Sequence, residues 1–436
     1  MYPAEFLNRM KMSLGAEEYS AFREALGEPP VRSLRFNALK AGDFLRDELI
    51  ERWALSPVPR CPDAYFYPED ARPGKDPLHE AGAYYIQEAS AAAPAEVLRV
   101  SPGEYVLDLC AAPGGKSTQL AAAMRGEGIL VSNEIVPSRC SILAENMERC
   151  GVSNAIITRE SPDVLAGHFP GFFDAILVDA PCSGEGMFRK NPEACEQWSP
   201  QNVELCAERQ DDILDSAAAM LSPGGRLCYS TCTFSEAEDE DAVERFLERH
   251  GDFTLVTSDK IMPHREAGEG QFYALFTKEG TPVPAQERLG RSRKVQPAKS
   301  SSLPDMTDIL QSFYIPEGIL VLQKDTVVLL PEGAPDTRGL KIQRAGLPLF
   351  TVKKNRLEPH HALAMATPAD KIKKSAPLDE AQAISYIKGE SFPCDAEPGW
   401  CIVTYRGVSM GTAKIAGGTL KNHYPKGLRR PPAFFS

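Results

Sequence analysis

Several features that would take the chain out of the ordinary globular class are missing from its 436 residues. No apolar run approaches the roughly 20 residues that a membrane-spanning helix needs, so we expect no membrane partner. The first residues contain neither a basic segment nor an apolar segment typical of secretory signals, which predicts a cytoplasmic location. Hydrophobic residues make up 43% and charged residues 25%, and this balance excludes wholesale disorder.

The cysteines and histidines also lack any metal-binding pattern. The eleven cysteines are an odd number, and no two form the C-x-x-C pair of zinc sites and redox dithiols. The seven histidines show no ligand spacing, so we expect no metal. We interpret the cysteines as reduced thiols, most of which are small buried hydrophobic residues.

Positive charge is scarce overall but gathers toward the C-terminus. The net charge is −12, yet residues 351–436 carry 13 Lys and Arg against 7 Asp and Glu. No carboxylate side chain follows Glu397, whereas six basic side chains do: Arg406, Lys414, Lys421, Lys426, Arg429 and Arg430. A basic segment on an acidic protein suggests a polyanionic partner, and a merely solvated face is the alternative.

Between residues 81 and 278, short apolar segments alternate with helical ones. The expected strands are 106–110, 128–133, 155–158, 173–179 and 226–230. The expected helices are 116–124, 137–150 and 202–221. This β-α-β-α order predicts an α/β fold with a mostly parallel sheet that helices cover on both faces.

Composition divides the whole chain into five parts. Residues 1–80 form a Pro-rich N-terminal extension with a short opening helix at 4–12 and a strand at 31–37, and residues 81–278 form the α/β domain. Residues 279–302 have the composition of a basic linker. The expected basic residues of this linker are Arg288, Arg291, Arg293, Lys294 and Lys299. Two small units follow at 303–378 and 379–436, the second with a strand at 399–405.

The strongest local motif is V-L-D-L-C-A-A-P-G-G-K-S-T at 106–118. An apolar strand ends in a glycine-rich loop that opens a helix, which brings backbone N–H groups and a helix N-terminus to a ligand. Glu134 follows the next strand, where a carboxylate can accept hydrogen bonds from ribose hydroxyls. The pair predicts a nucleoside cofactor at the carboxyl edge of the sheet.

Two other nucleotide sites fit this loop less well. A phosphate-binding loop requires glycine at the position of Cys110, and Pro113 lacks an N–H that phosphates need. The G-x-G-x-x-G spacing of a nicotinamide cofactor site is absent. We therefore consider an NTPase and a NAD-dependent enzyme to be much less favoured interpretations of this loop.

Two further motifs end neighbouring strands. They are D-A-P-C-S-G-E-G at 179–186 and Y-S-T-C-T at 229–233. Because strand ends of a doubly wound sheet line one crevice, Asp179, Cys182 and Cys232 are expected to meet beside the cofactor.

Through these motifs the chain resembles the Sun-type RNA (cytosine-5)-methyltransferases, and most closely their bacterial branch acting on small-subunit ribosomal RNA. The resemblance covers about residues 30–278, including R-F-N at 35–37 and L-H-E-A-G-A-Y-Y-I-Q-E at 78–88. Residues 411–414 and 420–425 resemble the PUA-like RNA-binding end of that branch. Residues 303–378 match less clearly.

The resemblance implies a class I, Rossmann-like methyltransferase sheet with small C-terminal RNA-binding units of α+β or β structure. The implied reaction is methyl transfer from S-adenosylmethionine to carbon 5 of cytidine in RNA, with 16S ribosomal RNA or the small ribosomal subunit as the expected partner. We expect a monomer. The rival from another class is a catalytically idle RNA-binding assembly factor that keeps the cofactor pocket.

The chemistry of cytosine explains why two thiols are needed. Carbon 5 becomes nucleophilic only after a thiolate adds to carbon 6, and a base must later remove the carbon-5 proton. The resemblance implies that Cys232 is the nucleophile, that Cys182 assists release and that Asp179 hydrogen-bonds the N3 edge of the base. Residues 183–186 and Lys190 are expected to shape the base pocket.

The resemblance also carries over cofactor residues. The loop residues for the methionine and ribose portions are Cys110, Ala111, Ala112, Pro113, Gly114, Gly115 and Lys116. Glu134 is assigned to the ribose hydroxyls, and Asp163 to the adenine amine, although Asp163 also suits a turn cap. Arg139 is an outer contact, and Asp179 borders the cofactor as well as the base.

Two groups of residues are candidates for RNA contacts. The aromatic residues Tyr65, Phe66 and Tyr67, close to Arg60 and Arg72, either stack on bases or pack in a core. The favoured phosphate contacts are Arg35, Lys414, Lys421, Arg429 and Arg430.

Overall fold

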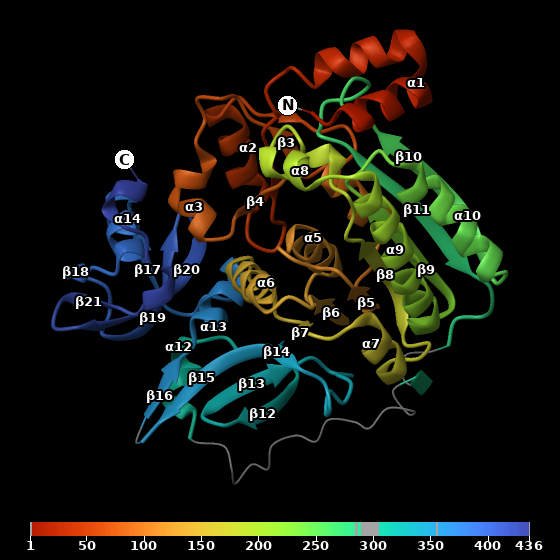
Figure 1. Ribbon diagram of the computed structural model, residues 1–436. Helices are drawn as coiled ribbons and strands as arrows, with labels where there is room; N and C mark the ends of the chain where they lie inside the picture. Colours follow the sequence, from red (N-terminus) through yellow and green to blue (C-terminus); the bar gives the residue numbers. More distant parts are fainter. Residues whose placement is uncertain (1, 284–286, 289–304, 355, 436) are drawn as a thin grey trace.

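A central eight-stranded sheet organises the molecule. Figure 1 shows the computed structural model, which describes residues 2–283, 287–288, 305–354 and 356–435. In spatial order the strands are β10 (Phe253–Ile261), β11 (Gln271–Lys278), β9 (Leu221–Thr231), β8 (Phe173–Asp179), β5 (Tyr105–Asp108), β6 (Ile129–Asn133), β7 (Ala155–Thr158) and β14 (Ile342–Ala345). The five inner strands β9, β8, β5, β6 and β7 are parallel, whereas β10, β11 and β14 run antiparallel to their neighbours.

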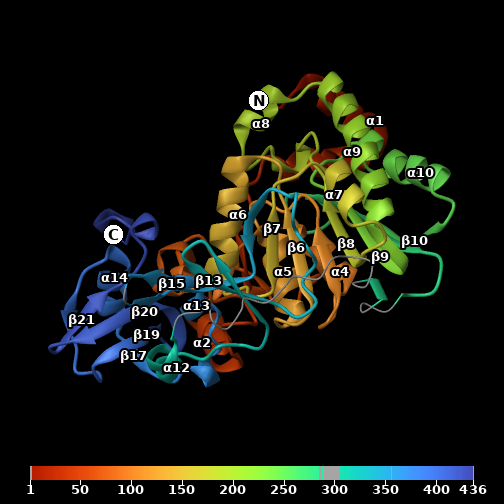
Figure 2. The same ribbon diagram turned by 90° about the horizontal axis from the view of Figure 1, so that it is seen from below.

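Helices cover both faces of this sheet, as Figure 2 shows. One apolar core lies under α4 (Ala93–Leu98), α5 (Gly115–Met124) and α6 (Pro137–Arg149). The other lies under α7 (Pro162–His168), α9 (Pro200–Met220) and α10 (Glu240–Arg249). Successive residues alternate between the two cores, for example Val106 and Leu107 in β5, because neighbouring strand side chains point to opposite faces. The α/β class with a mostly parallel, doubly covered sheet is confirmed.

The start of β9 differs from the sequence expectation. The strand begins at Leu221, directly after α9, and not at residue 226. Pro223 and the two glycines after it are typical of a turn, but here they lie within an irregularity of the β8–β9 ladder, between the pairs Phe173–Leu221 and Ala175–Arg226. The strand ends near the expected position, so the placement of Cys232 just beyond it is unaffected.

The N-terminal unit is larger than expected. Helix α1 runs over Ala4–Ala25 and continues past the expected end at residue 12, with a kink at Gly15, whose φ of 75° suits glycine. A four-stranded sheet follows, in the order β2 (Ser56–Pro57), β3 (Ala64–Phe66), β1 (Ser33–Phe36) and β4 (Tyr84–Ile86). Since β4 pairs with β1, the unit extends beyond the boundary expected at residue 80. Its helices are α2 (Asp43–Arg52) and α3 (Pro77–Glu80).

Two small sheets form the C-terminal part. The first contains β12 (Ile319–Gln323), β13 (Thr326–Leu330), β15 (Leu347–Lys353) and β16 (Arg356–Pro359), with α12 (Thr307–Ser312) and α13 (His361–Ala366). The second contains β17 (Ser375–Leu378), β19 (Gly399–Tyr405), β20 (Val408–Ala416), β21 (Thr419–Asn422) and β18 (Phe392–Pro393), with α14 (Glu380–Lys388). The strand expected at 399–405 is present as β19.

The boundary expected at residue 378 cuts through the second sheet. Strand β17 pairs in parallel with β19 and belongs to that sheet, while β14 leaves the first C-terminal unit to extend the central sheet. Pairing across more than twenty residues is not visible in local composition.

The two ends of the chain share one apolar core. Leu34 and Phe36 of β1 belong to the same cluster as Tyr386 of α14 and Cys401 of β19. The N-terminal sheet and the last C-terminal sheet therefore lie side by side (Figure 1). None of the helices in the described parts of the chain is long and apolar enough to span a bilayer.

The basic linker expected at 279–302 falls mostly outside the described residues, including Arg291, Arg293, Lys294 and Lys299. Arg288 is described, and its guanidinium pairs with Asp174 at 2.7 Å and donates to the Phe172 carbonyl at 2.7 Å. This arginine is buried against the central sheet and is not available to a polyanion.

Candidate active site

A cleft of about 930 Å³ opens at the carboxyl edge of the central sheet. Loops after β5, β6 and β8, the residue after β9 and the start of α7 form its walls, together with one face of α9. Eight of the predicted site residues line it: Cys110, Ala112, Glu134, Arg139, Asp163, Asp179, Cys182 and Cys232. The cleft therefore joins the predicted cofactor residues to the predicted catalytic residues.

The glycine-rich loop forms one end of this cleft. Gly114 precedes α5 with φ of 112°, and a Cβ there would lie 3.2 Å from Leu143, so a larger residue is disfavoured in conformation and in space. The loop is held from the side by Arg139, which donates to the Ala112 carbonyl at 2.9 Å. Ala111, Pro113 and Gly114 of the loop, and Gly115 and Lys116 at the start of α5, do not line the cleft.

Glu134 stands at the end of β6 as expected. Its side chain is 4% exposed; one oxygen accepts from the Val136 N–H at 2.8 Å, and the other lies 3.3 Å from Arg139. Arg139 thus contacts both the loop and this carboxylate, a role more central than an outer contact. A held carboxylate at this place suits a pair of ribose hydroxyls.

The walls beside Glu134 are apolar, which the sequence reasoning missed. Ile135 is 57% exposed and Val136 39% exposed, and both line the cleft with Pro162. Exposed apolar surface next to a carboxylate fits the flat face of a nucleoside base. Apolar residues directly after an acidic strand end are the only signal that could have indicated them.

Asp163 lies in the first turn of α7 and borders the cleft. The Ser161 side chain hydrogen-bonds the carboxylate and lowers its pKa. The residue is exposed, so both a ligand contact and a capping role remain compatible with its position.

The two thiols meet at the other end of the cleft. Cys182 lies in the loop after β8, Cys232 directly follows β9, and their Sγ atoms are 3.4 Å apart. The hydrogen bond to Cys232, followed by burial, raises the pKa of Cys182 well above its ordinary value. Cys182 is therefore held as a protonated thiol beside its partner.

Asp179, the last residue of β8, lies between the thiols and the glycine-rich loop. One carboxylate oxygen accepts from Ser230 Oγ at 2.8 Å and from Gln271 Nε2 at 3.2 Å, and the other pairs with Lys116 Nζ at 2.8 Å. Charge-assisted hydrogen bonds of this kind fix the orientation of a carboxylate. Lys116, which was predicted to contact the cofactor, therefore forms an ion pair with Asp179. Gln271 is a contact that the sequence did not predict.

Burial raises the pKa values of two groups at the base of the cleft, Asp108 and Cys110. Burial raises the pKa of Asp108 to about 7, although Ser117 Oγ donates to it at 2.6 Å. Burial likewise raises the pKa of the Cys110 thiol, so Cys110 is unreactive and contributes to the loop through its backbone and position. Of the cysteines around the cleft, only Cys182 and Cys232 form a pair.

A predicted phosphate contact, Arg35, and a predicted base-pocket residue, Lys190, do not lie where they were expected. Arg35 is 2% exposed, and its guanidinium donates to Gln87, to the Gly115 carbonyl and to Thr118. The expectation that Arg35 contacts phosphate is therefore wrong: the residue ties the N-terminal sheet to α5. Lys190 is exposed and lies outside the cleft.

The N-terminal aromatic group is packed. Tyr65 stacks edge-on against Phe36 with ring centroids 5.5 Å apart and lies under Arg46, while Arg60 is paired with Asp259 and Glu266. Core packing, the alternative interpretation of this cluster, accounts for Tyr65, and two ion pairs account for Arg60.

The basic C-terminal residues divide into two groups. Arg430 pairs with Glu80 at 3.1 Å, and Arg429 packs over Gly389, where its Nε is buried without a hydrogen-bond partner. Lys414, Lys421 and Lys426 are exposed. The three lysines present their charge to solvent without a carboxylate partner in the described part of the chain, whereas Arg406 and Arg430 are paired with Glu48 and Glu80.

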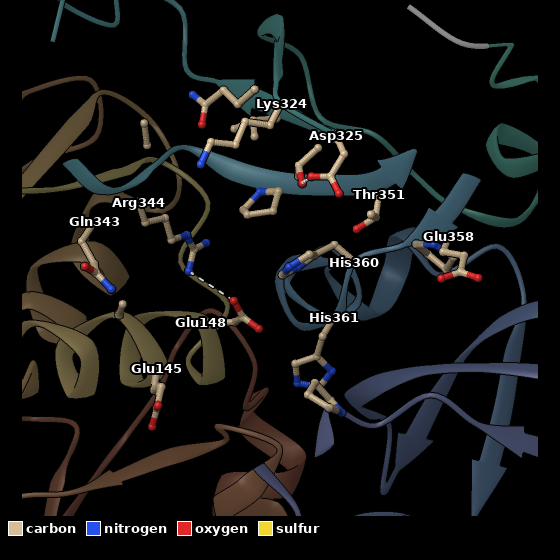
Figure 3. A pocket seen from close by; sticks show the side chains of 18 of the residues that line it. Glu145, Glu148, Lys324, Asp325, Gln343, Arg344, Thr351, Glu358, His360 and His361 are labelled. Carbon is tan, nitrogen blue, oxygen red and sulfur yellow. Dashed lines mark hydrogen bonds and ion pairs between the residues drawn. The ribbon is translucent and has the colours of Figure 1, made fainter. Parts of the chain in front are cut away.

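A second cleft, of about 940 Å³, lies between α6, the first C-terminal sheet and the last unit (Figure 3). Burial lowers the pKa of His360, and it lowers that of His361 to about 4, so both rings are neutral at pH 7. Arg344 lies 3.9 Å from Glu148 across this space. The lining of this cleft contains none of the predicted catalytic or cofactor residues.

Comparison with protein families accounts for most of the chain. Residues 95–280 match the family described as 16S rRNA methyltransferase RsmB/F, and residues 2–89 match the N-terminal domain of 16S rRNA methyltransferase RsmF. Residues 306–367 match the RsmF rRNA methyltransferase first C-terminal domain, and residues 373–430 match the methyltransferase RsmF PUA domain.

Individual relatives match along nearly their whole length. The chain is 35% identical to ribosomal RNA small subunit methyltransferase F of Shewanella loihica, over 92% of this chain and 90% of the relative. It is 34% identical to the protein of that name from an Enterobacter species, over 100% and 97%.

Solved structures resemble about two thirds of the chain. A methyltransferase homolog protein from Pyrococcus horikoshii is 26% identical, with a TM-score of 0.55 over 63% of this chain and 99% of that one. NSun6 from the same organism, solved with SFG, shares the fold at 21% identity and a TM-score of 0.57, over 64% of this chain and 99% of that one.

Proposed function

This chain belongs to the RsmB/F family of 16S rRNA methyltransferases, and we propose that Cys232 and Cys182 carry its chemistry, with Asp179 between them and the cofactor. The protein transfers a methyl group from S-adenosylmethionine to carbon 5 of cytidine in 16S ribosomal RNA. The observation that carries the residue assignment is the pair of Sγ atoms 3.4 Å apart at the wall of the cofactor-sized cleft.

The cleft residues suit S-adenosylmethionine. Glu134 would accept from the ribose hydroxyls, Ile135 and Val136 would cover the base, and the loop 110–116 would hold the methionine portion. Asp163 would meet the adenine amine, with Arg139 bridging the loop and Glu134. When bound, the sulfonium supplies an electrophilic methyl carbon.

In the proposed mechanism, Cys232 Sγ first forms a bond to carbon 6 of cytosine. Electron density then moves toward N3, which takes a proton, and the Asp179 carboxylate stabilises the resulting N3–H. Carbon 5 now has enamine character and accepts the methyl carbon. Loss of the carbon-5 proton to water re-forms the 5,6 double bond and expels the Cys232 sulfur as thiolate, and N3 gives back its proton. We assign assistance of this release to Cys182, because its protonated thiol lies next to the departing sulfur and can donate a hydrogen bond to it.

We further propose roles for the flanking units. Lys414, Lys421 and Lys426 on the last unit would contact phosphates of the RNA, and the N-terminal unit at 1–80 would contribute to the same surface, since the two share a core. The protein would act as a monomer in the cytoplasm, where free thiols stay reduced.

Tritium release tests this function. Purified protein is incubated with 16S ribosomal RNA carrying [5-³H]cytidine and with S-adenosylmethionine. Methylation at carbon 5 displaces the tritium into water, one per methyl group transferred. Methyl incorporation without tritium release would place the reaction at another atom and reject the proposal.

A further inference from the structure

Among residues 183–186, which were expected to shape the base pocket, Glu185 occupies an unusual position. It opens a short 3-10 helix, Glu185–Met187, three residues after Cys182, and its side chain has no solvent exposure. Both carboxylate oxygens are fully engaged. Arg9 Nη2 lies 2.5 Å from each, Trp198 Nε1 donates to one at 2.8 Å, and the Phe234 N–H donates to the other at 3.1 Å.

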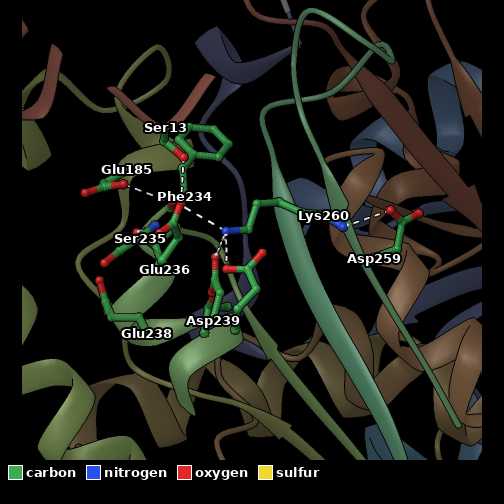
Figure 4. Close-up of polar contacts among 12 residues, drawn as sticks. Ser13, Glu185, Phe234, Ser235, Glu236, Glu238, Asp239, Asp259 and Lys260 are labelled. Atoms are coloured by element: carbon green, nitrogen blue, oxygen red, sulfur yellow. Dashed lines mark hydrogen bonds and ion pairs between the residues drawn. The ribbon is translucent and has the colours of Figure 1, made fainter. Parts of the chain in front are cut away.

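The Phe234 contact connects Glu185 to the second thiol loop, because Phe234 is two residues beyond Cys232 (Figure 4). Two more hydrogen bonds join the same loops: Gly186 N–H donates to the Cys232 carbonyl at 2.9 Å, and the hydroxyls of Ser183 and Thr233 are 2.8 Å apart. A Cβ on Gly186 would lie 3.0 Å from the Cys232 carbonyl oxygen, so the loops are in close contact. These hydrogen bonds hold the two thiol loops against each other.

A second buried carboxylate holds the Cys182 loop from the other side, and the two differ in their partners. Glu238 accepts from the Ser183 N–H at 2.9 Å, from its hydroxyl and from Gln210, all uncharged groups, and burial raises its pKa. Glu185 has a guanidinium within hydrogen-bond distance. A buried carboxylate that keeps a cation depends strongly on that cation.

This cation comes from outside the catalytic unit. Arg9 belongs to α1, and its guanidinium also stacks over the rings of Phe6 and Trp198 at about 6 Å. On the next turn of α1, Ser13 donates to Glu236 at 2.6 Å, in the loop that follows Cys232 (Figure 4). Helix α1 therefore contacts the loops of both thiols.

We propose that Glu185 is a positioning residue that fixes the spacing of Cys182 and Cys232, and that Arg9 makes this spacing depend on the docking of α1. The inference rests on the proposed roles of the two thiols. Bonding of Cys232 to carbon 6 needs one sulfur, whereas release needs both sulfurs at one base. Loosening the loops should therefore slow release more than it slows addition.

The test is the Glu185→Gln variant, in which an amide N–H replaces one acceptor and faces the donors that the carboxylate served. We expect kcat for tritium release to fall about 10- to 100-fold, since mispositioning of catalytic groups by about 1 Å has effects of this size. The KM for RNA and the affinity for S-adenosylmethionine should stay within about twofold, and a covalent protein–RNA adduct should accumulate on denaturing gels.

Two variants complete the design. Glu204→Gln removes an exposed carboxylate of the adjoining groove and should behave as wild type. Arg9→Ala should reproduce the adduct and the loss of kcat, Arg9→Lys should restore part of the activity, and the double variant with Glu185→Gln should be no worse than Arg9→Ala alone. If Glu185→Gln does not fold, the pair Arg9→Ala and Arg9→Lys decides.

Wild-type kcat with no adduct in a folded Glu185→Gln protein would overturn the inference, as would equal losses in cofactor affinity and kcat, which indicate general disruption. Absence of tritium release by the wild-type protein would instead reject the proposed function. The two failures are thus distinguishable in one assay.

Discussion

Two regions of the molecule differ in how tightly their functional side chains are held. They are the loops of Cys182 and Cys232 and the basic C-terminal sheet. The loops are buried and cross-linked by short hydrogen bonds, and their sulfur atoms are 3.4 Å apart. The last unit exposes Lys414, Lys421 and Lys426 on its surface, and of these Lys414 lies over the ring of Trp400. Bond formation needs positions defined to within a fraction of an ångström, whereas attraction to a phosphate chain needs only charge at about the right place. Substitutions should therefore affect rate in the first region and affinity in the second.

The largest effect is expected for Cys232→Ala. Without the sulfur atom, carbon 6 has no nucleophile, and we expect kcat to fall by about 10⁴-fold or more. RNA affinity, measured by filter binding, should remain within about twofold. Methylation at a tenth of the wild-type rate would contradict the assignment of the nucleophile.

Asp108, the buried carboxylate at the end of β5, should make the stability of the fold that carries the thiol loops sensitive to pH. The pKa of Asp108 is raised to about 7 from 3.8 in the unfolded chain, so its contribution to stability is complete below pH 3.8 and is lost as pH rises through 7. The loss is at most about 4 kcal/mol, from about three pKa units.

Urea unfolding at pH 5 and pH 8 measures this loss. The wild-type protein should be less stable at pH 8 by a few kcal/mol, and Asp108→Asn, which keeps an acceptor for Ser117, should remove most of the difference. The same pH dependence in both proteins would show that Asp108 is already charged in the fold.

The smallest effect is expected on the C-terminal sheet. Replacing Lys414, Lys421 and Lys426 together by Ala should weaken RNA binding about tenfold and reduce the slope of log affinity against log salt by about 2. The kcat at saturating RNA should not change. The matched control is Arg430→Ala, because this guanidinium is paired with Glu80 and should leave the salt slope unaltered.

Equal slopes for the triple variant and the wild-type protein would show that these lysines do not touch phosphate. A fall in kcat with unchanged affinity would remove the distinction between the two regions.

The catalytic loops could be predicted from sequence because their signals are local. A strand end followed by Pro-Cys or by a lone cysteine places a thiol at the sheet edge whatever the rest of the chain does. The sequence lists the basic C-terminal side chains, but it does not predict which of them are free to contact RNA. The partners of Arg406 and Arg430 are Glu48 and Glu80, more than 300 residues away.

Other contacts have the same non-local origin. Arg35 hydrogen-bonds Gln87 and the start of α5. Strand β14 pairs with β7, which lies nearly two hundred residues earlier in the chain. Neither pairing leaves a mark in the pattern of hydrophobic and polar residues around it. The exposed Ile135 and Val136 were missed because an apolar side chain in a sequence predicts burial.

Mapping the covalent adduct of the Cys182→Ala protein tests the central claim most directly, namely that Cys232 bonds to the base and Cys182 assists its release. This variant keeps the sulfur that bonds to carbon 6 and lacks the one that assists release, so it should remain attached to the RNA. After nuclease and protease digestion, mass spectrometry should find the cytidine on the peptide that contains Cys232. A cytidine attached to any other residue, or no adduct while methylation proceeds at the wild-type rate, would contradict the account.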